Sequence, residues 1–235
     1  MGYNRIRVFV AAMISLLLCP IFSFAQTGDK KNEVWAYGMV GKNTIEHFYQ
    51  GFNVFYTRKM TSRVNLMGGI EFNSKKKGFG GVLAEGSYKL PLKHFNLIFS
   101  GRGVYNYYGK YNMNEYLFRL AVHAQSEHFD ILFGNSFLGY SSYGSSVFEP
   151  ITWSVGFGAN VMKRSSPWNV GIFLKNYDYF IYENWNINFG VRGYYELIAD
   201  KVRLTGELLV RPAGNINQLA QRYDTGLKIG AQFKW

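Results

Sequence analysis

Apolar and polar residues alternate one by one along most of this chain. The stretch EYLFRLAVHAQ, from Glu115, places Tyr116 and Phe118 on one face and Glu115 and Arg119 on the other. The stretches WNINFGVRGYYE and KVRLTGELLVR repeat this pattern, as do the last residues, DTGLKIGAQFKW. A period of two is typical of β-strands with one apolar face. The alternation therefore predicts an all-β protein.

Twelve strands are expected, with ten to fourteen left open. They span approximately 33–41, 47–59, 63–74, 79–90, 94–108, 113–126, 128–140, 148–163, 168–179, 184–198, 200–212 and 222–235. Strands of a soluble sandwich also alternate, but they are usually about 5–6 residues long. The greater length of the strands expected here favours strands that cross a membrane.

The connections alternate between short and longer ones in the same register. The short ones are KMTS, LPLK, SEH, KRSSP and IADK, and the longer ones include GKNTIE, NSKKKGFG, YGKYNMN and RPAGNINQLAQRYD. Bacterial outer-membrane barrels have short periplasmic turns, longer external loops and an even number of strands. The pattern predicts a transmembrane antiparallel up-and-down β-barrel of about twelve strands, with both chain ends in the periplasm.

The first residues are expected to direct export. MGYNRIR is basic, VFVAAMISLLLCPIF is apolar, and SFA provides small residues before a cut, as in a secretory signal peptide. We therefore expect a cleaved signal at 1–25, a short periplasmic tail at 26–32 and the barrel at 33–235. The sole cysteine, Cys19, would leave with the signal. This organisation predicts the outer membrane of a Gram-negative bacterium.

The last strand ends on an aromatic residue. Its alternating residues are Tyr223, Leu227, Ile229, Phe233 and Trp235. In this respect the chain resembles bacterial outer-membrane β-barrel proteins, in which the terminal aromatic belongs to the signal read by the barrel-insertion machinery. The resemblance covers the mature chain as a pattern, identifies an architecture without a specific functional family, and implies that machinery as a partner.

Aromatic side chains are also expected where the barrel meets the two membrane surfaces, as in other membrane barrels. These interface aromatics are Trp153, Trp168, Trp185, Phe233 and Trp235. Outer-membrane lipid and lipopolysaccharide are the expected surroundings. The lysine run 75–77 is expected in an external loop, where it is either solvated or in contact with lipopolysaccharide phosphates.

The faces opposite the apolar ones are expected to line the lumen. The charged candidates are Glu71, Glu85, Lys89, Arg102, Glu115, Arg119, Asp130, Lys175, Arg192, Glu196, Arg203, Glu207, Arg211 and Lys228. Two interpretations remain open. Opposite charges could pair and fill the lumen, or a water-filled pore with a modest positive excess could favour small anions. Barrels of eight strands are filled and barrels of sixteen hold a channel, so twelve does not decide between them.

The first functional hypothesis is a small passive porin-like channel. The alternative is a closed structural or adhesive barrel that acts through external loops at 140–150, 178–184 and 212–222. A lipid-modifying enzyme is the third, but none of the four histidines has a serine two residues later. An outer-membrane protease would need carboxylate pairs and a histidine at the outer rim, but Asp178 and Glu183 are expected to be solvated loop carboxylates. We therefore predict no catalytic residues, no metal site and no cofactor. Despite a net charge of +11, the spread of charge over many strands argues against nucleic acid.

Overall fold

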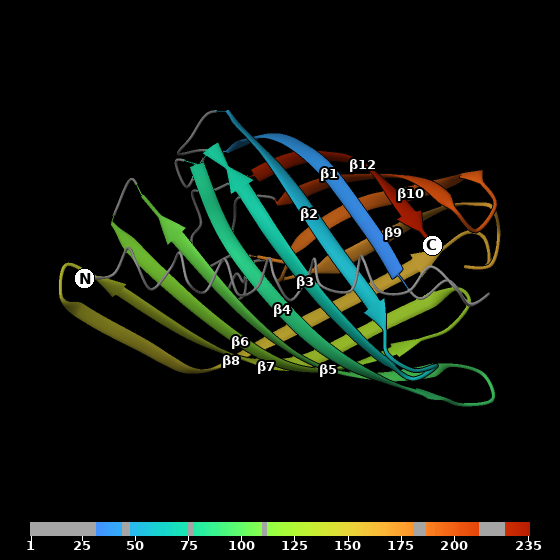
Figure 1. Ribbon diagram of the computed structural model, residues 1–235, viewed down its shortest axis with the longest axis horizontal. Helices are drawn as coiled ribbons and strands as arrows, with labels where there is room; N and C mark the ends of the chain where they lie inside the picture. The colour runs from blue at the N-terminus through green and yellow to red at the C-terminus, as the bar shows by residue number, and fades with distance from the viewer. Residues whose placement is uncertain (1–31, 44–47, 75–77, 110–111, 181–186, 212–223) are drawn as a thin grey trace.

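The described residues form one closed β-barrel of twelve antiparallel strands (Figure 1). The computed structural model describes residues 32–43, 48–74, 78–109, 112–180, 187–211 and 224–235. The predicted fold class and strand number are confirmed. The expected signal peptide and nearly all of the expected tail lie outside the described residues.

Each strand pairs with its neighbours in chain order. The strands are β1 (Asn32–Asn43), β2 (Tyr49–Lys59), β3 (Val64–Asn73), β4 (Gly78–Pro91), β5 (Asn96–Tyr108), β6 (Met113–Gln125), β7 (Phe129–Ser142), β8 (Ser145–Asn160), β9 (Trp168–Lys175), β10 (Asn188–Ile198), β11 (Val202–Arg211) and β12 (Asp224–Lys234). The first residues of β1 and the last residues of β12 lie at the end of the barrel that carries the five short connections. We call this end the terminus end. The opposite end is called the loop end.

The barrel closes where β1 pairs with β12, with Glu33 opposite Lys234 and Asn43 opposite Asp224. The backbone of Trp235 extends this seam, because its N–H donates to Asn32 and its carbonyl accepts from Asn32. Closure leaves no strand edge with unpaired N–H and C=O groups, and such an edge could not persist in lipid. The alternating last strand is therefore the strand that completes the wall.

The two faces of the wall differ as the alternation predicts. Along β6, Glu115, Leu117, Arg119 and Ala121 are buried, whereas Tyr116, Phe118, Leu120 and Val122 are exposed. Inward positions include charged, amide and glycine residues, and the outer surface carries a broad apolar band that continues over β7, β9 and β12. In the part of the chain that the structure describes, no helix is long and apolar enough to cross a membrane.

The loop expected at 140–150 is a hairpin instead. Strand β7 continues to Ser142 and β8 begins at Ser145, so the turn consists of Tyr143 and Gly144. Both have positive φ, 48° and 83°, as a two-residue turn with the twist of a hairpin requires. The expectation was wrong because Tyr-Gly is not among the dipeptides that usually mark such a turn. The loop expected at 212–222 lies outside the described residues.

Candidate functional site in the barrel lumen

A five-residue segment, Asn176–Phe180, turns from the end of β9 into the lumen, and we call it the inner segment. Strand β9 has eight residues although its neighbour β8 has sixteen. The side chain of Asn176 ends the pairing, because its Oδ1 accepts from the N–H of Val155 (2.8 Å) and its Nδ2 donates to the carbonyl of Trp153 (2.7 Å). An asparagine side chain thus takes the place of backbone partners, and the chain is free to leave the wall.

The far end of the inner segment packs on aromatic rings of β1 and β2. The Tyr179 ring lies 4.8 Å from Trp35 and 4.7 Å from Phe55, and Phe180 lies 5.7 Å from Phe55 (ring centroids). Trp35 and Phe55 are themselves stacked at 4.2 Å. Phe55 and Phe180 are 0% and 1% exposed. An aromatic core therefore occupies the middle of the lumen on this side.

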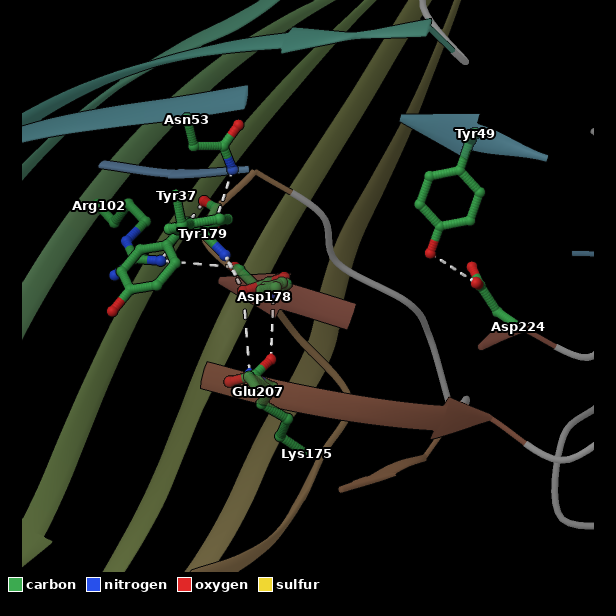
Figure 2. A network of polar contacts seen from close by, with 10 residues as sticks. Tyr37, Tyr49, Asn53, Arg102, Lys175, Asp178, Tyr179, Glu207 and Asp224 are labelled. Atoms are coloured by element: carbon green, nitrogen blue, oxygen red, sulfur yellow. Dashed lines mark hydrogen bonds and ion pairs between the residues drawn. The ribbon is translucent and has the colours of Figure 1, made fainter. Parts of the chain in front are cut away.

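Polar groups of β5 hold the backbone of the inner segment. A terminal nitrogen of Arg102 donates to the carbonyls of Asp178 (3.5 Å) and Tyr179 (3.4 Å), and its guanidinium lies 4.9 Å from the Tyr179 ring centroid. The buried amide of Asn106 donates to the carbonyl of Phe180 (2.7 Å). Hydrogen bonds from β5 therefore hold the segment in addition to the ring packing, and Figure 2 shows Arg102 beside Asp178 and Tyr179.

Asp178 joins a buried cluster of two lysines and two carboxylates. Its carboxylate accepts from Lys228 and lies 3.9 Å from Lys175. Both lysines also contact Glu207, at 3.1 Å from Lys175 and 3.0 Å from Lys228 (Figure 2). Burial raises the pKa of Asp178, but Lys228 and Lys175 outweigh it and hold this pKa well below its ordinary 3.8. Asp178 is therefore ionised near neutral pH, and the cluster is electrically balanced.

Two arginines on neighbouring strands share one carboxylate. Arg102 and Arg119 stand opposite each other in the β5–β6 register. Glu85 accepts from Arg102 at 2.6 Å but lies 3.9 Å from Arg119. The Arg119 guanidinium lies 4.4 Å from the ring centroid of Tyr177 in the inner segment, and its Nε has no hydrogen-bond partner. The side chain of Arg119 is only 4% exposed.

Other predicted lumen residues form separate pairs toward the two ends. At the terminus end, Asp130 contacts Arg164, Arg192 and His123, and Arg203 pairs with Glu196. Toward the loop end, Arg211 and Tyr49 both bond Asp224, and Glu115 accepts from Asn106. Glu71 is buried and Lys89 is half-buried. Most of the predicted charges therefore meet partners across or along the wall.

A small cavity lies between the inner segment and the loop end. Its volume is about 60 Å³, and its lining includes Tyr177, Asp178, Lys228, Tyr49 and Asn188. It is therefore open space on the loop side of the segment, and Lys228, which holds Asp178, is one of the residues that line it.

The structure corrects the expectation for Asp178. We predicted a solvated carboxylate in an external loop at 178–184, but Asp178, Tyr179 and Phe180 lie inside the barrel. The rest of that loop, with Glu183, lies outside the described residues. Sequence reasoning also missed the interior role of Trp35 and Phe55, although both fall by parity on the face opposite the lipid.

The predicted interface aromatics are found on the outer face where they are described. Trp153, Trp168, Phe233 and Trp235 are each between 42% and 49% exposed. Trp235 also lies 6.4 Å from Tyr56 (ring centroids) near the seam. Trp185 lies outside the described residues.

Groups with possible catalytic or metal chemistry are sparse in the described part of the chain. No group of three His, Cys, Asp or Glu side chains there could hold a metal ion. Asp130 contacts His123, at 3.7 Å between Nε2 and a carboxylate oxygen. His128 instead faces the carbonyl of Asn160 at 3.3 Å. Because Asp130 also pairs with two arginines, its environment is that of an ion-pair cluster.

Comparison with known proteins identifies the architecture. No family model and no curated protein matches the chain. Among solved structures, an outer membrane channel from Pseudomonas putida F1 is 11% identical, with 91% of this chain and 98% of that chain covered and a TM-score of 0.57. The outer membrane protein Omp33 from Acinetobacter baumannii is 12% identical, with 89% and 100% covered and a TM-score of 0.51. This chain has the fold of a bacterial outer-membrane β-barrel.

The translocator domain of the autotransporter NalP from Neisseria meningitidis is also similar. It is 11% identical, with 99% of this chain and 98% of that domain covered and a TM-score of 0.51. A channel and an autotransporter domain thus share this architecture. The likeness establishes the fold, and function has to be argued from the lumen.

Proposed function

We propose that this protein is an outer-membrane channel of porin-like type whose lumen is closed, in this conformation, by the inner segment. The observation that carries the proposal is the course of Asn176–Phe180, which leaves the wall and meets β1, β2, β5 and β12 inside the barrel. A structural barrel could fill its interior with side chains of the wall alone. A separate chain segment that is held by hydrogen bonds, ion pairs and ring packing, and that is not part of the wall, can instead dock and undock.

The outer apolar band supports a membrane location. Leu120, Phe133 and Ile172 represent it on three strands and are 51%, 54% and 59% exposed. A soluble monomer rarely exposes so continuous an apolar surface, whereas a membrane barrel requires one. This band, together with the fold of the similar proteins, supports our proposal that the chain lies in a bacterial outer membrane.

The test is single-channel current in planar bilayers, recorded on the refolded chain 26–235. Wild type is expected to show rare openings, because Tyr177 and Tyr179 hold the inner segment. The double variant Tyr177→Ala, Tyr179→Ala removes the Arg119 and Arg102 ring contacts and the packing on Trp35, so its openings should be frequent.

The control is Tyr195→Ala, which removes a tyrosine that is 56% exposed on the outer face and should conduct as wild type does. A double variant that is folded, as judged by circular dichroism, yet as silent as wild type would refute the proposed channel.

A closed barrel that acts through its loop end is the second candidate. The β7–β8 hairpin favours it, because Tyr143, Val147 and Phe148 at its tip are 83%, 60% and 63% exposed. Exposed aromatic and apolar side chains suit a contact surface. A silent double variant, together with binding of a partner that is lost on replacing Tyr143 and Phe148 by Ser, would support this candidate over the channel.

A further inference from the structure

The inner segment covers four cations of the barrel wall, which we call the cation band: Arg102, Arg119, Lys175 and Lys228. The described wall residues that pair with them are two carboxylates, Glu85 and Glu207. The wall alone therefore has an excess of positive charge at this level. The inner segment supplies one further anionic group, the carboxylate of Asp178, and two neutral acceptors, the backbone carbonyls that accept from Arg102.

Arg119 shows that the segment fits this surface only in part. Its side chain is 4% exposed, its closest carboxylate oxygen is 3.9 Å away, and its Nε has no hydrogen-bond partner. A buried guanidinium N–H without a hydrogen-bond acceptor is costly, and such a group calls for an explanation in terms of a ligand or water. Tyr177 covers it with a ring, which supplies no acceptor oxygen at the Nε.

The groups that the segment presents to the wall follow a simple order. The carboxylate of Asp178 lies with Lys228 and Lys175, and the next residue, Tyr179, places its ring against Trp35 and beside Arg102. A carboxylate next to an aromatic ring is therefore what this part of the lumen holds. The wall matches both groups, because the two lysines attract the carboxylate and Arg102 lies against the ring, an arrangement that suits a guanidinium.

We propose that the cation band is a binding site for small organic carboxylates that carry an aromatic ring, and that the inner segment occupies it as a tethered competitor. Asp178 stands in for the carboxylate of the solute and Tyr179 for its ring. This inference rests on the proposed function, because it treats the inner segment as displaceable. The same solute that passes through the barrel would then favour the undocked segment, by binding the surface that undocking exposes.

The experiment measures binding of phenylacetate to the refolded chain 26–235 in detergent micelles by isothermal titration calorimetry. The variant Asp178→Asn removes the tethered charge while keeping the side-chain shape. We expect phenylacetate to bind this variant at least tenfold more tightly than wild type. Adding Lys228→Gln to Asp178→Asn should remove that gain.

The matched control is Asp200→Asn. Asp200 lies in the turn between β10 and β11, where its φ is 55°, a conformation that asparagine also adopts readily. This variant should bind phenylacetate as wild type does. If Asp178→Asn, folded by circular dichroism, binds no more tightly than Asp200→Asn, the proposal is refuted. In case Asp178→Asn does not fold, Tyr179→Ala empties the ring position and should likewise bind more tightly than wild type.

Two further probes decide the class of solute. Phenylacetamide has the same ring without the charge, and inorganic phosphate has charge without a ring. Both should bind Asp178→Asn at least tenfold more weakly than phenylacetate, and equal binding of either would overturn the assignment to aromatic carboxylates.

Binding is measured without a membrane, so the two proposals can fail separately. A barrel that binds phenylacetate but does not conduct would refute only the proposed channel. A barrel that conducts but does not bind phenylacetate would refute only the proposed binding site.

Discussion

The contact between Gly156 and the inner segment gives the sharpest prediction. A Cβ at Gly156 on β8 would lie 2.7 Å from Oη and 3.0 Å from Cε1 of Tyr177. Both distances are too short for an undisturbed contact, so Gly156→Ala must move Tyr177 or the segment that carries it. The glycine is thus required by the close approach of the ring.

The magnitude follows from overpacking. Forcing extra atoms into a packed interior costs about 1–3 kcal/mol. Since the clash exists only while Tyr177 is docked, this free energy shifts the docking equilibrium toward the open state. At about 1.4 kcal/mol per tenfold, the open fraction should rise roughly 5- to 150-fold.

Single-channel recording measures the open fraction directly, as the open probability of the channel. The control is Gly103→Ala on β5, where a Cβ would meet nothing within 4 Å. Both variants replace a strand glycine by alanine, so they share the gain in backbone propensity of about 0.5–1 kcal/mol. In a Tyr177→Ala background the effect of Gly156→Ala should vanish, because the clashing ring is gone. An open probability that is the same for Gly156→Ala and Gly103→Ala would refute the docked position of Tyr177.

Three further predictions concern charge and assembly. Glu85→Gln leaves two buried arginines without their carboxylate and should cost about 3–5 kcal/mol in urea unfolding of the lipid-bound barrel, whereas Arg119→Met should be nearly neutral; equal losses would contradict this. The pKa of docked Asp178 is lowered, so ionised Asp178 stabilises the docked segment at pH values above its ordinary pKa of 3.8. This stabilisation is lost as the pH falls below 3.8. Open probability should therefore be flat from about pH 8 to 5 and rise below about pH 4 in wild type but not in Asp178→Asn. Deleting Trp235 removes two backbone hydrogen bonds to Asn32 and should slow folding into vesicles; an unchanged rate would argue against a role of this residue in closing the seam.

The fold could be predicted because a membrane barrel repeats one simple constraint. Along each strand, apolar residues that face lipid must alternate with residues that face the lumen. A period of two is therefore found in nearly every strand. β6 is the clearest case, with Glu115 and Arg119 inward and Tyr116 and Phe118 outward. Boundaries were missed where one side chain decides them, as Asn176 does at the end of β9.

The inner segment could not be predicted because its residues fit an exposed loop equally well. Tyrosine and aspartate are common in external loops. Polar and aromatic residues still alternate through Tyr177 and Tyr179, although these rings fall on the inward parity of β9. A weak signal existed on the wall, where Trp35 and Phe55 place large aromatics on the inward faces of β1 and β2. Large inward rings need something to pack against, and the partner is far away in sequence.

The width of the barrel explains why a separate segment fills it. In eight-stranded barrels side chains of opposite walls meet, and in sixteen-stranded ones they leave a channel. Here Arg102 on β5 and Lys228 on β12 each reach the inner segment, which lies between them. In the proposed channel the two interpretations left open by the sequence are compatible. Most lumen charges have partners, as in a filled barrel, but Asp178 and the carbonyls that accept from Arg102 belong to five residues of a connection. A lumen whose pairing depends on a connection can be emptied by moving that connection, which a lumen filled from its own wall cannot.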